Sequence, residues 1–295
     1  MQIQIETRGR PERPGRHERP ADETRSPQSS ERLMWLNADR VLYVGLLGAP
    51  SVRTFGAVSI YLSLHQPHRI CVEGGEWEET MLSVVPPYVG HRIMSDERMI
   101  CNILIESETV RLDALPLALR DVRGAVDAPE LARRMHEALA RFKRCASRQY
   151  ARTEDFDEAF FGGALPARAI DRRIGAVLDR IKRDPNSHTS AEDCAVASHL
   201  SVSRFLHLFK SEVGSPFRSF RTWQRARSVL YFVTQSDNLA NIALDVGYPD
   251  STHFSHSIRQ VYGLTPKSIF AGCRKLALYG SGAAASTQRY ALGVG

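Results

Sequence analysis

Two stretches near the C-terminus repeat the same order of apolar and polar positions. The first begins at Ala195 and the second at Ala243. The matching residues lie 49 positions apart: Phe205 and Phe254, His207 and His256, Phe209 and Ile258, Lys210 and Arg259, Gly214 and Gly263. In both stretches the apolar side chains recur at spacings of three and four, which predicts a short helix, a turn and a longer helix. The pattern therefore indicates two helix–turn–helix units in tandem.

The longer helices are expected at about 202–213 and 251–262, where Ser201 and Asp250 stand at the N-cap positions. A connecting helix over 217–233 would hold the two units about one turn of B-DNA apart, roughly 34 Å. One such pattern alone is also typical of any pair of antiparallel helices. Two copies with matching core, cap and exposed positions favour DNA recognition.

One face of each longer helix is polar and is expected to be exposed. It carries the candidate DNA-contacting residues Ser203, Leu206, His207, Lys210, Ser251, Thr252, Ser255, His256 and Arg259. Serine and threonine side chains are short enough to let the backbone approach base edges, and a histidine can donate to a purine N7 or O6. Lys210 and Arg259 lie farther along their helices and suit phosphates, which position the protein without specifying the sequence. The pattern predicts sequence-specific binding of double-stranded DNA through two adjacent major grooves.

The rest of the chain divides by composition and periodicity. Residues 1–30 are rich in Arg, Glu, Pro and Ser and are expected to be disordered. Short β-branched and aromatic runs separated by turn residues fill 31–112 and predict a small barrel or sandwich. A helical linker or dimerisation segment follows over 113–166, the two helix–turn–helix units over 168–275, and a flexible tail over 276–295. The predicted fold class is α+β multidomain, with an N-terminal β-barrel, a helical linker and an all-α C-terminal domain.

One predicted helix of the linker has an apolar face. Its apolar residues are Leu131, Met135, Ala138, Leu139, Phe142 and Cys145. Such a face either packs on its own domain or forms the seam of a homodimer through 129–147, and the periodicity does not choose between them.

The charge supports a polyanionic partner. The net charge is +6, and residues 171–275 contain 15 lysines and arginines against nine aspartates and glutamates, so the whole surplus lies where the repeat lies. The five cysteines are scattered and typical of reduced, buried thiols. No apolar run reaches the roughly 18 residues that span a bilayer, and no secretory signal is present. We expect a cytoplasmic protein without a membrane, a cofactor, a bound metal or catalytic residues.

The stretch from Asp171 to Cys273 resembles the AraC/XylS family of bacterial transcriptional regulators. The motifs that carry the resemblance are A-S-H-L-S-V-S-R-F-L-H-L-F-K, R-A-R-S-V-L, I-A-L-D-V-G-Y, H-F-S-H and Y-G-L-T-P. The resemblance implies two helix–turn–helix units bridged by a helix, and promoter activation through contacts with RNA polymerase. Three positions depart from the family pattern: His199 replaces a common glycine in the turn, Ile258 a phenylalanine and His256 an arginine. A left-handed backbone at His199 would cost roughly 1 kcal/mol.

The β-rich part is similar to the cupin-type sensing domain common in this family. The segment 84–93, V-V-P-P-Y-V-G-H-R-I, is like the second cupin motif, whereas the first metal motif is not intact. The candidate effector-binding residues are Trp77, Tyr88 and His91, although core or turn roles are equally compatible with the pattern. His65, His68 and His91 would bind a metal only if they converged.

Three functions are compatible with these features. The first is a transcription activator controlled by a small-molecule effector. The second is a regulator without an effector, whose N-terminal barrel mediates only dimer or protein contacts. The third is a cupin-type metal enzyme fused to a DNA-binding module. A metal cluster would favour the third, and a filled N-terminal core the second.

Overall fold

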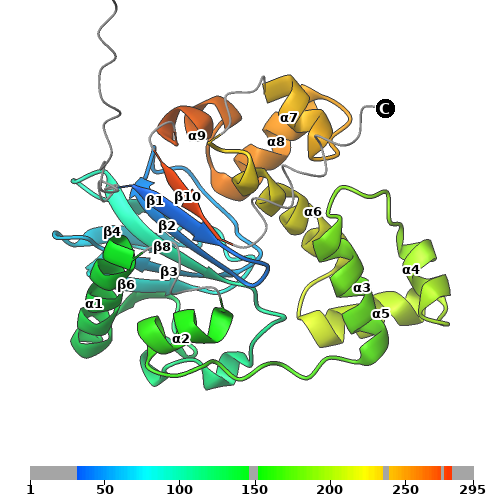
Figure 1. Ribbon diagram of the computed structural model, residues 1–295, viewed down its shortest axis with the longest axis horizontal. Coiled ribbons are helices and arrows are strands. Elements are labelled where there is room, and N and C mark those ends of the chain that lie inside the picture. The colour runs from blue at the N-terminus through cyan, green and yellow to red at the C-terminus, as the bar shows by residue number, and fades with distance from the viewer. Residues whose placement is uncertain (1–31, 146–151, 235–238, 274–275, 281–295) are drawn as a thin grey trace, which may run out of the picture.

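The computed structural model describes residues 32–145, 152–234, 239–273 and 276–280. A β-rich N-terminal domain and a helical C-terminal domain lie side by side (Figure 1). The predicted disordered segment 1–30 and most of the predicted tail lie outside the described residues. No described helix is long and apolar enough to cross a membrane.

The N-terminal domain is built on two sheets. Its strands are β1 (Leu33–Leu36), β2 (Arg40–Leu46), β3 (Val58–Leu62), β4 (His68–Val72), β5 (Glu78–Thr80), β6 (Leu82–Val85), β7 (His91–Met94), β8 (Met99–Ile105) and β9 (Gly124–Val126). The larger sheet has the order β10-β1-β2-β8-β3-β6-β9 and the smaller one β5-β4-β7. Among the described residues, no ladder of strand hydrogen bonds joins the two into a closed ring. The predicted sheet-rich domain is present, but the predicted closed barrel is not: short apolar runs reveal strands, whereas closure depends on which edges pair.

The strand at one edge comes from the far end of the chain. β10 (Ala277–Tyr279) pairs in parallel with β1, with Leu278 opposite Met34. The tail was expected to be flexible from residue 276, and its first residues instead extend the N-terminal sheet. The C-terminal domain is therefore attached to the sheet by its own last described strand.

Two helices and two short 3-10 turns cover the face of the large sheet that lies away from the C-terminal domain (Figure 1). They are α1 (Pro129–Cys145), α2 (Thr153–Phe161), η1 (Leu112–Ala114) and η2 (Leu117–Leu119). Met135, Ala138 and Phe142 of α1 are fully buried in the same core as Trp35 of β1. The Trp35 ring stacks on Phe156 of α2 with centroids 4.8 Å apart. The apolar face of α1 thus packs on its own domain, which is the first of the two alternatives that the sequence left open.

The C-terminal domain contains the two predicted units. Its helices are α3 (Arg172–Arg183), α4 (Ala191–Ala197), α5 (Val202–Val213), α6 (Phe217–Ser228), η3 (Val229–Tyr231), α7 (Leu239–Asp245), α8 (Ser251–Tyr262) and α9 (Pro266–Gly272). Ser190 and Asp193 form a capping box at the start of α4, and the Ser201 and Asp250 side chains cap α5 and α8. His199 adopts φ 55° in the first turn, the left-handed conformation that the family's glycine suits.

The two units differ in how their cores connect to the rest of the molecule. Apolar residues of α3, α4, α5 and the start of α6 form a core of their own, centred on Phe205, Phe209 and Phe220. The core of the second unit, including Phe254 and Ile258, is continuous with the apolar face of the large sheet. The second unit is therefore the one packed on the N-terminal domain.

Candidate nucleic-acid interface and interdomain cavity

The candidate DNA-contacting residues lie on the outer faces of α5 and α8. Eight of them are exposed: Ser203, Leu206, His207, Lys210, Ser251, Thr252, His256 and Arg259. Ser255 is half-buried. The opposite faces hold Phe205 and Phe209 in one unit and Phe254 and Ile258 in the other, all at most 1% exposed. The predicted division of each helix into a buried and an exposed face is thus present, while contact with DNA remains a prediction.

The N-terminus of α8 carries a further polar group that the pattern analysis did not select. The Asp250 carboxylate accepts hydrogen bonds from the backbone N–H groups of Thr252 and His253, both at 2.8 Å. Its other oxygen lies 2.7 Å from Nδ1 of the exposed His253 ring. These bonds lower the pKa of Asp250, and the hydrogen bond from the His253 backbone N–H contributes most. The repeat does not point to His253, because the equivalent position in the first unit is Arg204.

Helix α6 and its neighbours hold the two units together. Arg221 of α6 donates to the carbonyl oxygens of Thr189 and Ser187 in the first unit. The Arg225 guanidinium lies 5.6 Å from the ring centroid of Tyr248 in the second unit. Arg221 and Arg225 lie one turn apart on α6. This helix therefore couples the orientations of the two units, and with them of α5 and α8.

Buried ion pairs attach this assembly to the N-terminal domain. The Glu106 carboxylate, in the segment after β8, accepts hydrogen bonds from Trp223 Nε1 at 2.9 Å and Gln224 Nε2 at 3.0 Å, and lies 2.8 Å from Arg227 Nε. Lys182 of α3 lies 2.8 Å from Glu108. Burial raises the pKa of Glu106 to about 7, with Glu108 adding to the rise and Arg227 opposing it.

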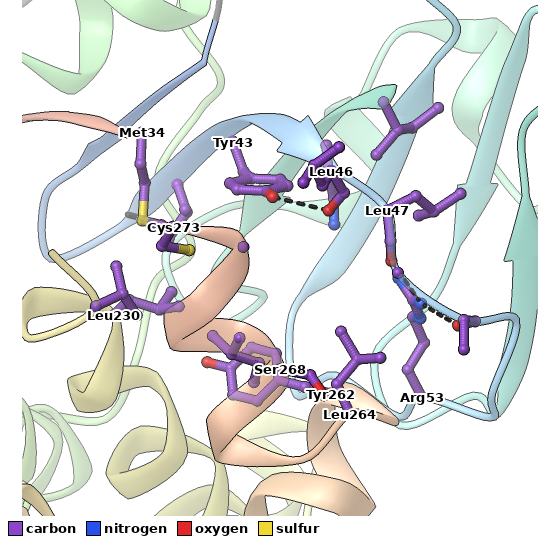
Figure 2. A pocket seen from close by; sticks show the side chains of 18 of the residues that line it. Met34, Tyr43, Leu46, Leu47, Arg53, Leu230, Tyr262, Leu264, Ser268 and Cys273 are labelled. Carbon is purple, nitrogen blue, oxygen red and sulfur yellow. Dashed lines mark hydrogen bonds between the residues drawn. The ribbon is translucent and has the colours of Figure 1, made fainter. Parts of the chain in front are cut away.

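A cavity of about 520 Å³ lies between the two domains. Its walls come from β1, β2, β3, β8 and the loop after β2 on one side, and from η3, the end of α8 and α9 on the other. Figure 2 shows Met34, Cys273 and Leu230 toward one side of the view, and Arg53 with Leu264 toward the other. Most of the lining is apolar, so the N-terminal face is not fully filled by its own side chains.

Three polar side chains of the sheet side line this cavity. The Tyr43 hydroxyl donates to the Leu46 carbonyl oxygen at 2.8 Å. Asn102 lies opposite both Tyr43 and Tyr61 in the strand register. Burial raises the pKa of Tyr61 to about 12, and the nearby Arg53 guanidinium opposes that rise.

None of the three residues predicted to bind an effector lines this cavity. Trp77 is 39% exposed directly before β5, with the Arg92 guanidinium 5.3 Å from its ring centroid. Tyr88 has φ 62° and lines a separate hollow beside Arg218. His91 lies one layer behind the cavity, where Nε2 is 2.7 Å from the hydroxyl of the cavity-lining Tyr61.

The histidines considered as metal ligands do not converge. His68 is buried with its two ring nitrogens 2.8 Å from Ser63 and Ser83 hydroxyls, and His65 lies exposed beside Glu97. Burial lowers the pKa of His68 and of His91 to about 4, so both rings are neutral near pH 7. Within the described residues no group of three or more histidine, cysteine or acidic side chains is placed to hold a metal ion.

Comparison with known proteins singles out the C-terminal half. A family model described as a helix-turn-helix domain matches residues 194–271. A 97-residue segment is 29% identical to an uncharacterized HTH-type transcriptional regulator of Haemophilus influenzae, covering 32% of this chain and 33% of that protein. A 109-residue segment is 29% identical to the arabinose operon regulatory protein of Escherichia coli, covering 36% and 37% of the two chains. The matches thus span about a third of the length of these curated relatives.

Likeness in fold extends farther than likeness in sequence. The crystal structure of an apo ToxT variant from Vibrio cholerae matches 80% of this chain and 98% of its own, with a TM-score of 0.54 and 13% sequence identity. At that identity the match concerns the fold alone. It shows that a sheet-rich N-terminal domain followed by two helix–turn–helix units is an arrangement shared with a solved protein.

Proposed function

The chain belongs, through its C-terminal domain, to the AraC/XylS family of transcriptional regulators, and we propose that it regulates transcription by binding two adjacent major grooves through α5 and α8. The proposal rests on α5 and α8. Each helix buries aromatic or aliphatic side chains on one face and exposes mainly polar side chains on the opposite face. The tandem units, the basic surplus and the family match support the same function.

The reading faces divide by position along each helix. Ser203, Leu206 and His207 on α5 would contact base edges, and Lys210 the phosphates. On α8 the equivalent base-reading set is Ser251, Thr252, Ser255 and His256, with Arg259 on phosphates. Leu206 is 39% exposed, an apolar side chain that suits a thymine methyl group.

We place the control by a small molecule in the interdomain cavity. Its volume of about 520 Å³ lies within the range of roughly 300–1,000 Å³ typical of ligand sites. Residues of both domains line it, so a ligand there would favour one arrangement of the domains over others. A ToxT structure is described with an unsaturated fatty acid bound, which supports control of a protein of this fold by a small ligand.

Contact with RNA polymerase, and activation rather than repression, follow from the family alone and complete the proposal. The regulator without an effector is the second candidate, and the unfilled cavity argues against it. The cupin-type metal enzyme is the third candidate, and it lacks support because no group of three or more histidine, cysteine or acidic side chains among the described residues is placed to hold a metal ion.

Selection of bound DNA from a random library tests the proposal. The wild type should enrich two boxes about one helical turn apart, His207→Ala should lose preference in one box and His256→Ala in the other. His65→Ala, an exposed histidine of the N-terminal domain, is the matched control and should select the same sequences as wild type. Weak, salt-sensitive binding without sequence preference by the wild type would reject the proposal.

A further inference from the structure

The interdomain cavity contains a buried positive charge for which the described part of the protein supplies no counter-ion. We propose that its ligand is an apolar monocarboxylic acid whose carboxylate is held by Arg53. This inference rests on the proposed function only where it gives the ligand a regulatory role, since ligand binding itself requires no DNA.

The charge of the cavity lining is one-sided. Arg53 and Arg98 line it, and none of its lining residues is aspartate or glutamate. Arg98 is exposed at the rim, whereas Arg53 is only 5% exposed. The field inside the cavity is therefore positive and favours an anion.

Arg53 differs from the other buried arginines of the described structure. Arg40 lies 2.8 Å from the Asp157 carboxylate, and Arg227 lies 2.8 Å from that of Glu106. No carboxylate of the described residues lies within ion-pair distance of Arg53.

The groups around the Arg53 guanidinium are neutral. Its Nη2 donates to the carbonyl oxygens of Leu47 and Ala49, each at 3.4 Å, and its buried Nε has no hydrogen-bond partner among the described residues. The nearby Tyr61 hydroxyl, with its pKa raised to about 12, stays uncharged at neutral pH. These neighbours can solvate the guanidinium in part, but none balances its charge.

An unpaired guanidinium in an apolar site is unfavourable unless something neutralises it. The planar guanidinium binds a carboxylate through two parallel hydrogen bonds. One buried arginine balances one negative charge, so a monoanion fits better than a doubly charged phosphate. The surrounding Leu46, Leu47, Ile100 and Leu264 require that the rest of the ligand be apolar.

The position of Arg53 is fixed before any ligand arrives. Its backbone N–H donates to the His91 carbonyl oxygen at 2.9 Å, and the His91 N–H donates to its carbonyl oxygen at 3.1 Å. A site held by such a bridge loses little conformational entropy on binding. This gives His91 a part in the site through its backbone.

A second polar atom of the cavity also lacks a partner among the described residues. Asn102 is 7% exposed on β8, and its buried Oδ1 accepts no hydrogen bond from them. A hydroxyl on the ligand could donate to this oxygen, so a hydroxylated acid should bind more tightly than the plain acid of the same skeleton.

Calorimetric titration of the full chain without DNA tests the assignment. The probes are dodecanoate and cinnamate, each paired with its uncharged methyl ester. At least one acid should bind, with an affinity roughly tenfold or more above that of its ester, the factor expected for one charge-assisted pair. Arg53→Met should abolish this preference, and Arg53→Lys should retain part of it. Arg69→Met, at an exposed arginine paired with Asp96 on the small sheet, should behave as wild type.

Equal binding of acids and esters, failure of both acids to bind, or an acid preference that survives in Arg53→Met would overturn the inference. If Arg53→Met does not unfold cooperatively, Arg53→Lys decides: an unchanged acid-to-ester ratio together with unchanged affinity counts against Arg53. Acid binding that leaves DNA affinity unaltered would support the ligand class and contradict the regulatory role, so the two proposals fail separately.

Discussion

The buried ion pair between Glu106 and Arg227 joins the two domains, and its removal should be costly. The two side chains are 1% and 5% exposed, with 2.8 Å between Oε1 and Nε. Glu106→Gln would leave the Arg227 guanidinium buried without a counter-ion. Breaking such a pair from one side costs about 3–5 kcal/mol of unfolding free energy. Arg227→Met should cost less, because Arg227 holds down the pKa of Glu106, and without it the buried carboxyl becomes protonated and is no longer a charge.

Urea unfolding of the wild type, both single variants and the double variant measures this interaction. The double variant should lose less than the sum of the two single losses, by about 2 kcal/mol or more, because it contains no uncompensated charge. Arg133→Ala, which removes the exposed pairs with Glu130 and Glu137 on α1, is the control and should leave the unfolding midpoint unchanged. Additive losses, or single losses no larger than the control's, would refute the reasoning.

Three further predictions concern the turn, the phosphate contacts and the buried histidines. His199→Gly should raise the unfolding free energy by about 1 kcal/mol, because it relieves a left-handed backbone at an exposed position, and a thermal scan checks this. Lys210→Ala and Arg259→Ala should each weaken DNA binding to all sequences and reduce the slope of log affinity against log salt by about 1. His68 and His91 have pKa values of about 4 in the folded protein, below the 6.5 of a free histidine, so the folded state disfavours their protonation. Their contribution to the unfolding free energy should be fully present above about pH 6.5 and be lost as the pH drops toward 4. His68→Gln should make this loss smaller in acid-titration unfolding curves.

Local signals in the sequence located the helices of the C-terminal domain accurately. Ser201 and Asp250 mark helix starts through their own side chains, so α5 and α8 occupy the residues predicted for them. The connecting helix is shorter than expected, since α6 ends at Ser228 and continues as the 3-10 turn η3. Caps and periodicity act within a few residues, which is why one sequence reveals them.

The features that the sequence did not predict depend on contacts between distant segments. Arg53 and residues of α9, more than 200 positions later, line the same cavity, and no spacing rule relates such segments. The pattern selected Trp77 and Tyr88 because aromatic residues suit ligand sites, but nothing local indicates which face they join. β10 consists of three residues beside a Gly- and Ala-rich tail, and only its pairing with β1 identifies it.

Simultaneous binding of two DNA boxes by α5 and α8 is tested most directly by changing the distance between the boxes while the protein stays the same. Five base pairs inserted between the two selected boxes would turn the second box about half a turn around B-DNA. Because α6 links the units and Arg221 and Arg225 of α6 contact both, the account predicts that affinity falls to that of a site with one box scrambled. Unchanged affinity for the spaced site, measured at the same salt concentration, would contradict simultaneous reading by α5 and α8.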